Sequence, residues 1–262
     1  MIYPDDCKLK EKIIFDSHAH YTDEKFDIER DELLEQLNKN GIYGIIDCGC
    51  SEVSSKKSLN LSKKYDFIYS AVGLHPEDID KGTDLSFIKE LAKDKKCVAI
   101  GEIGLDYYWN KENALLQKQV FEEQIIIAKE LDLPIIVHDR EAHADTMEIL
   151  LKHKPKGVVH CFSGSAEMAR QIIDLGMYIG VGGVATFKNA RKLPEVISAI
   201  PNDRLLIETD SPYLAPEPVR GSICHSGLIP YTAAKISEIK GIDTESVLKI
   251  TMNNAKELFG IL

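Results

Sequence analysis

The chain has 262 residues, of which 44% are hydrophobic and 28% are charged, and no Gly/Ser/Pro-rich linker divides it. Such a length and composition suit one large α/β barrel, or two modest domains, and do not fit a disordered chain. The formal net charge of −10 argues against a protein that coats nucleic acid through a broadly basic surface.

Short β-branched apolar runs alternate with longer, charged, helix-periodic segments, a pattern typical of repeated βα units. Eight such runs are predicted as strands, at residues 13–16, 44–48, 67–72, 98–102, 134–138, 157–160, 178–181 and 205–208. Helices are predicted between them, for example over 27–40, 111–131 and 244–259. Eight parallel strands favour a TIM (β/α)8 barrel that forms a single domain over residues 1–262. An open doubly wound sheet fits less well, because the first strand is not followed by a Gly-rich phosphate loop.

The first twelve residues show neither an apolar signal core nor an Arg-rich amphipathic pattern, and no run approaches ~18 apolar residues. We therefore expect a cytoplasmic protein with no membrane span. The six cysteines lack the spacing of a disulfide scaffold or a zinc ribbon, so reduced thiols are expected.

Histidines and carboxylates recur at one place in the predicted units. His18 and His20 end the first strand, where side chains two residues apart share a face. A lone His-x-His pair is at least as often structural as ligating. The same placement is repeated, however, at or just beyond other strand ends, by His75, Glu102, His138, His160 and Asp210. Because the carboxyl ends of barrel strands meet at one rim, where active sites lie, we expect these side chains to meet there.

Imidazole and carboxylate ligands together suit zinc, manganese or cobalt better than an ion that prefers oxygen alone. Six candidate ligands exceed the needs of one tetrahedral ion, so two divalent cations are predicted, with zinc first and magnesium, manganese or cobalt as alternatives. The predicted ligands are His18, His20, Glu102, His138, His160 and Asp210. Glu102 is the expected bridge and Asp210 the expected general base, while Glu208 is expected behind the ligands.

These residues lie in motifs that resemble the TatD-type metal-dependent deoxyribonucleases, a branch of the amidohydrolase-like barrels. The matching segments are DSHAH (16–20), GLHP (73–76), GEIGLDY (101–107), VHDR (137–140), HCFSG (160–164), ETDSPY (208–213) and NAKELF (254–259). By this resemblance, His18 and His20 with Asp210 hold one ion, and His138 and His160 hold the other. Glu102 then bridges, where many relatives that cleave C–N bonds use a carbamylated lysine.

One loop departs from the family pattern. The family often shows Arg-Gly-x-x-Asn-x-Pro after the eighth strand, and the chain here reads RGSICHSGLIP over 220–230. Arg220 and His75 are predicted to bind substrate. A surface ion pair for Arg220, and a turn cap before Pro76 for His75, are equally good interpretations.

The resemblance implies a deoxyribonuclease, exonuclease-like, that hydrolyses phosphodiester bonds by a two-metal mechanism. Its expected partner is DNA, single-stranded or at ends, with no obligatory protein partner. Tyr107, Tyr108 and Trp109 could stack on an unpaired base or pack against the next loop. The alternative function is hydrolysis of a small amide, lactone or aminoacyl ester on the same metal site. A non-catalytic metal or ligand binder ranks last, because Asp210 is present.

Overall fold

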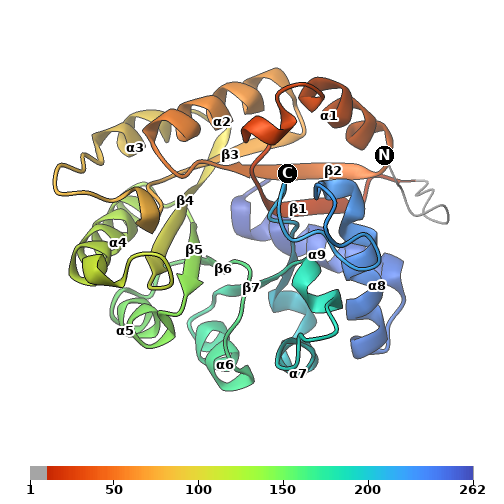
Figure 1. The fold of residues 1–262 in the computed structure, drawn as a ribbon. Coiled ribbons are helices and arrows are strands. Elements are labelled where there is room, and N and C mark those ends of the chain that lie inside the picture. Colours follow the sequence, from red (N-terminus) through yellow and green to blue (C-terminus); the bar gives the residue numbers. More distant parts are fainter. Residues whose placement is uncertain (1–10, 262) are drawn as a thin grey trace.

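A computed structural model describes residues 11–261 of the chain. Within these residues, eight parallel strands form one sheet in the order β1 to β8, and helices surround it (Figure 1). This arrangement confirms the predicted TIM barrel. The strands are β1 (Ile14–Ala19), β2 (Ile42–Cys48), β3 (Ile68–Val72), β4 (Cys97–Asp106), β5 (Ile135–Arg140), β6 (Gly157–Val159), β7 (Tyr178–Val181) and β8 (Leu205–Ile207).

The outer layer consists of α-helices that follow the strands around the barrel. They are α1 (Arg30–Lys39), α2 (Glu52–Lys64), α3 (Ser86–Leu91), α4 (Ala114–Glu130), α5 (His143–His153), α6 (Ala166–Asp174), α7 (Leu193–Ala199), α8 (Ile229–Lys240) and α9 (Thr244–Phe259). Side-chain caps explain some of the bounds. The Asp243 side chain accepts a hydrogen bond from the Ser246 amide at the start of α9, and Gly260 ends that helix in the left-handed region. The predicted helix 244–259 is thereby confirmed, whereas the one predicted over 27–40 is shorter, at Arg30–Lys39.

Three strands run further at their carboxyl ends than predicted, and all three extensions carry polar side chains. β1 continues to Ala19, β4 to Asp106 and β5 to Arg140. The β4–β5 ladder continues as far as Asp106 opposite Arg140, so the later residues of β4 are held by regular pairing. Their buried polar side chains break the apolar pattern on which the prediction depended, because they belong to a site and not to the core.

The barrel closes between β1 and β8 by contacts near one end. Ala19 and Ser211 form a single parallel bridge, and the Asp210 amide donates to the His18 carbonyl at 3.0 Å. The buried Asp16 carboxylate adds hydrogen bonds from the Thr209 amide and hydroxyl. These bonds hold the segment after β8 beside the end of β1.

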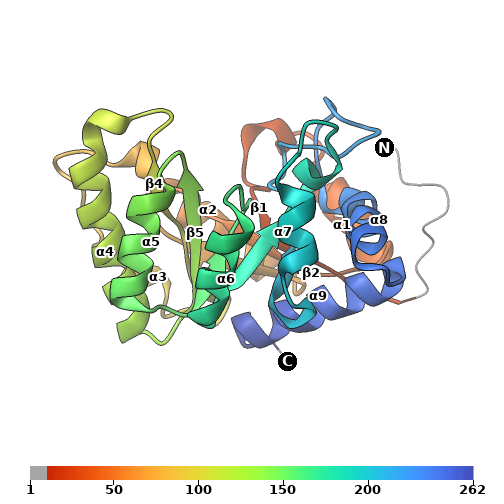
Figure 2. The same ribbon diagram turned by 90° about the horizontal axis from the view of Figure 1, so that it is seen from below.

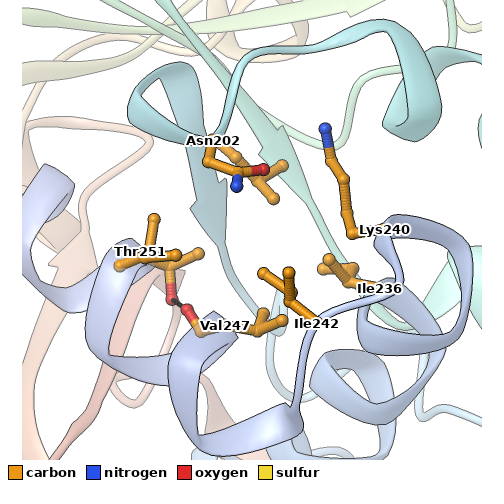
Figure 3. Close-up of a pocket in the computed structure, with 8 residues that line it drawn as sticks. Asn202, Ile236, Lys240, Ile242, Val247 and Thr251 are labelled. Carbon is orange, nitrogen blue, oxygen red and sulfur yellow. Dashed lines mark hydrogen bonds between the residues drawn. The ribbon is translucent and has the colours of Figure 1, made fainter.

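The opposite end of the barrel is apolar and covered. Figure 2 shows α9 across that end, away from the loops that follow the strands. The Phe259 ring of α9 stacks on Phe15 of β1, with 6.4 Å between ring centroids. A pocket nearby, between α8, α9 and the start of β8, is lined by Ile236, Ile242 and Val247 among others and is too narrow for a water molecule (Figure 3). Among the described helices, none is both long and apolar enough to cross a membrane.

Candidate metal centre

Glu102, from β4, lies between two pairs of histidines with one oxygen toward each pair. Its Oε1 lies 2.8 Å from His138 Nδ1 and 2.8 Å from His160 Nε2. Its Oε2 lies 3.4 Å from Nε2 of both His18 and His20. The facing nitrogens of His18 and His20 are 3.0 Å apart, and those of His138 and His160 are 3.3 Å apart. One buried carboxylate is therefore shared by two groups of nitrogen donors.

Asp210 joins the pair of histidines from β1. Its Oδ1 lies 3.5 Å from Nε2 of both His18 and His20. Its backbone has a positive φ of 58°, an uncommon conformation for a residue other than glycine, and the hydrogen bond to the His18 carbonyl holds it there. The Asp210 side chain is 19% exposed and that of Glu102 only 5%. Asp210 is thus the carboxylate of the pair that reaches solvent.

Neighbouring acceptors determine which nitrogen of each histidine faces inward. His20 Nδ1 lies 2.9 Å from the carbonyl oxygen of Cys48, to which it donates. His138 Nε2 lies 2.9 Å from Asp106 Oδ2, an acceptor when ionised. In the neutral ring, the opposite nitrogen of each histidine then carries a lone pair toward Glu102. Orientation of ligating histidines by such partners is common in metal sites.

The charges of the cluster act strongly on one another. Burial by itself raises the pKa of the Glu102 carboxyl, but His160, His75 and His18 outweigh burial and hold that pKa well below its usual value. Burial lowers the pKa of His138, but the hydrogen bonds that His138 donates to Asp106 and Glu102 outweigh burial and raise that pKa to about 9. The cluster therefore favours an ionised Glu102 beside a protonated His138, and a cation that bound there would displace that proton.

Within the described residues, several overlapping triplets of His, Glu, Asp and Cys side chains place their ligand atoms within 4.8 Å of one another. The triplets include His18 with His20 and Asp210, and His18 with Glu102 and His160. Lone pairs and carboxylate oxygens this close repel unless protons or cations lie between them. Imidazole and carboxylate donors in such a cluster fit divalent cations of the zinc or manganese kind. All six residues predicted as ligands are brought together here.

The two predicted substrate residues differ in their positions. His75 lies at the cluster, with Nε2 3.5 Å from Glu102 Oε1, and its Nδ1 also accepts a hydrogen bond from the Glu77 amide that caps a 3-10 turn. The contact with Glu102 is compatible with substrate binding by His75, and the hydrogen bond from Glu77 is compatible with a turn cap. Arg220 lies on the loop after β8, and its guanidinium is 4.1 Å from the centroid of the Phe187 ring. A role for either residue in substrate binding stays a prediction.

Sequence reasoning gave no role to Asp106, which holds His138 from behind. Its partner lies 32 residues away in the chain, so only the β4–β5 pairing shows the contact. Glu208 lies behind the cluster, with Oε1 3.6 Å from His160 Nδ1, and it also accepts a hydrogen bond from the Cys161 amide. Asp16 was also missed. Burial raises its pKa to about 7, and it joins β1 to Thr209 and Ser226.

Comparison with known proteins gives matches along nearly all of the chain. A family model described as TatD related DNase matches residues 15–260. The uncharacterized metal-dependent hydrolase YabD of Bacillus subtilis (strain 168) is 44% identical over 254 residues, which cover 95% of this chain and 100% of that protein.

Two further matches add a named activity and a solved structure. A Cronobacter sakazakii protein named 3'-5' ssDNA/RNA exonuclease TatD is 33% identical over 259 residues, covering 94% of this chain and 97% of that protein. The crystal structure of YJJV, a TatD homologue from Escherichia coli K12, superposes with a TM-score of 0.89 at 29% identity, over 96% of this chain and 99% of that one. The barrel thus has a solved counterpart over 96% of the chain.

Proposed function

This chain belongs to the TatD-related DNase family, whose members are metal-dependent hydrolases, and from that premise we propose that it hydrolyses phosphodiester bonds of DNA. The proposed substrate is a single strand or a frayed end, cut from a free end as an exonuclease does. The relative from Cronobacter sakazakii, named as an exonuclease for single-stranded DNA and RNA, supports this choice.

The observation that carries the proposal is the position of Glu102 between two donor groups. Oε2 faces His18 and His20, and Oε1 faces His138 and His160. A carboxylate with one oxygen toward each group is the arrangement expected of a bridge between two cations. We therefore propose two divalent cations, with zinc as the first candidate.

When bound, such cations would polarise a phosphoryl oxygen and make a water molecule more acidic. In the proposed hydrolysis, a residue of the chain handles the proton of the attacking water. Water supplies the oxygen that bonds to phosphorus, and the bond between phosphorus and the departing sugar oxygen of the neighbouring nucleotide breaks. Asp210 receives the proton of the attacking water, because it is the carboxylate of this pair that is open to solvent. The departing sugar oxygen takes up a proton, which balances the proton that Asp210 received from water.

His75 and Arg220 are the proposed contacts to the rest of the substrate. His75 Nε2 lies 3.5 Å from Glu102 Oε1, so its ring borders the place where a phosphate would lie. Arg220 lies on the loop after β8, at the same end of the barrel, and could pair with a phosphate further along the strand.

The test is to offer metal-reconstituted protein a labelled single-stranded oligonucleotide and, in parallel, amide, lactone and aminoacyl-ester substrates. We expect cleavage of the oligonucleotide only, and loss of that cleavage in Asp210→Asn. Asp203→Asn is the matched control, because it makes the same change on an exposed residue just before β8, at the other end of the barrel. Turnover confined to the amide or ester substrates would replace the nuclease proposal with the alternative hydrolase.

A further inference from the structure

The loop after β4 carries two large aromatic side chains in solvent. Tyr108 is 57% and Trp109 62% exposed. Large apolar groups that lie together in solvent often mark a binding site. Tyr107 differs, since it packs against the core and its hydroxyl donates to Asp145 at 2.6 Å. Packing against the rest of the protein, including the hydrogen bond to Asp145 of α5, therefore explains Tyr107 alone.

Asp106 fixes the backbone of these aromatic residues to the metal centre. Its Oδ1 accepts hydrogen bonds from the backbone amides of Tyr108 and Trp109, at 2.9 Å and 3.0 Å. Its Oδ2 contacts His138 Nε2 at 2.9 Å. The Asp106 carboxylate thus links the aromatic loop to His138, a predicted metal ligand. Hydrogen bonds therefore fix the distance between the loop and the metal centre.

Arg140 adds a positive charge to the same place. Its guanidinium lies 4.0 Å from the centroid of the Tyr108 ring and 5.5 Å from that of Trp109. Among residues 11–261, no carboxylate forms an ion pair with it. Arg140 follows His138 by two residues on β5, and the loop after β4 lies at the same end of the barrel as the loop after β8 (Figure 2).

We propose that Trp109, Tyr108 and Arg140 form a stacking subsite for an unpaired nucleobase next to the phosphate held at the metal centre. The inference rests on the proposed nuclease function and specifies how a single strand would be held. The base would stack on the open indole of Trp109. The Tyr108 ring lies perpendicular to that indole, with 4.8 Å between centroids and 86° between planes. Arg140 would meet a phosphate of the same strand.

The chemistry of the three side chains favours a base over other occupants. Aromatic platforms with a neighbouring cation recur in proteins that bind single strands without strong sequence preference, because every base offers a π face. A duplex would keep its bases stacked on one another and would leave the platform unused. The subsite therefore selects single-stranded over double-stranded substrate.

Trp109 is the single tryptophan of the chain, so its fluorescence reports on the subsite directly. The experiment titrates full-length Asp210→Asn protein, loaded with zinc, with oligothymidylate of about ten nucleotides. We expect the indole emission to be quenched as the strand binds. A strand of the same length that has abasic sites throughout keeps the phosphates but offers no base, and it should leave the emission unchanged.

Binding measured by anisotropy of a labelled strand separates stacking from phosphate contacts. Trp109→Leu, made in the Asp210→Asn background, should weaken binding of oligothymidylate roughly 10-fold and leave binding of the abasic strand as it was. Trp109→Phe should restore most of the affinity, since it keeps an aromatic face. Leu151→Ala, an exposed apolar residue on the outer face of α5, is the control and should change nothing.

The inference is overturned if Trp109→Leu weakens both strands equally, or if oligothymidylate binds without affecting the emission. Either result, together with cleavage of oligonucleotides by the unaltered protein, would remove the subsite and leave the nuclease function in place. Absence of oligonucleotide cleavage by the unaltered protein would instead remove the function on which the inference rests.

Discussion

The two ends of the barrel are built from the same strands but from opposite kinds of side chain. At the carboxyl ends of the strands, His18, Glu102 and His160 are nearly buried and lie against one another. At the other end, Phe15 and Phe259 stack in an apolar cluster that α9 covers. The pocket beside that cluster does not admit a water molecule (Figure 3).

The difference separates stability from chemistry in this molecule. Buried polar groups such as those of the metal centre are costly to fold around, and the apolar end supplies packing that offsets the cost. In barrels of this kind, residues at the carboxyl ends serve reaction and those at the other end serve stability. Substitutions at the two ends should therefore change different measurements.

Glu102→Gln should have the largest effect on activity. The change keeps the shape of the side chain and removes the charge shared by both histidine pairs. Because metal-ion catalysis is worth several kcal/mol, we expect kcat/KM to fall by roughly 1000-fold or more, and bound metal to fall with it. Steady-state kinetics and elemental analysis measure both quantities, and full activity of the variant would contradict the bridging role.

Phe259→Ala should have the converse effect. Loss of a buried phenylalanine that stacks on Phe15 leaves a cavity, and the free energy of unfolding should fall by about 3–5 kcal/mol. Activity per folded molecule should stay unchanged. Urea unfolding and kinetics at low temperature check the two parts, with Leu151→Ala as a surface control expected within ~0.5 kcal/mol. If kcat/KM of the folded variant fell as well, the separation between the ends would be wrong.

Asp106→Asn should lower the affinity of the centre for metal without abolishing metal binding. Asp106 accepts hydrogen bonds on both sides, from His138 and from the amides of Tyr108 and Trp109, and an amide side chain offers an acceptor to only one side. Loss of such a partner typically costs about 10–100-fold in metal affinity or activity. Competition with a chromogenic chelator measures the affinity. An unchanged affinity would show that His138 is positioned without Asp106.

Arg140→Gln should give the smallest change. The guanidinium has no carboxylate partner among the described residues, so the variant should fold normally and lose one phosphate contact. For a single strand, the slope of log affinity against log salt should become shallower by about 0.7. Binding of abasic and base-bearing strands should weaken alike. A loss confined to base-bearing strands would mean that Arg140 only supports the aromatic rings.

Periodicity predicted the eight strands and the long C-terminal helix because apolar side chains facing a core repeat regularly. It ended β1, β4 and β5 too early, because polar side chains of the site, such as those of His18 and Asp106, interrupt the apolar pattern there. The six candidate ligands could be predicted because strand ends converge at one rim of a barrel. Asp106 and Asp16 could not, since each acts on residues that only the folded chain brings near, His138 for one and Thr209 for the other.

The proposed metal centre holds two cations, one on either side of Glu102. The most direct measurement is anomalous diffraction at the zinc edge from crystals of zinc-reconstituted protein. Two peaks about 3.5–4 Å apart are expected, one beside His18 and His20 and the other beside His138 and His160. A single peak, or peaks away from Glu102 in fully active protein, would contradict the claim.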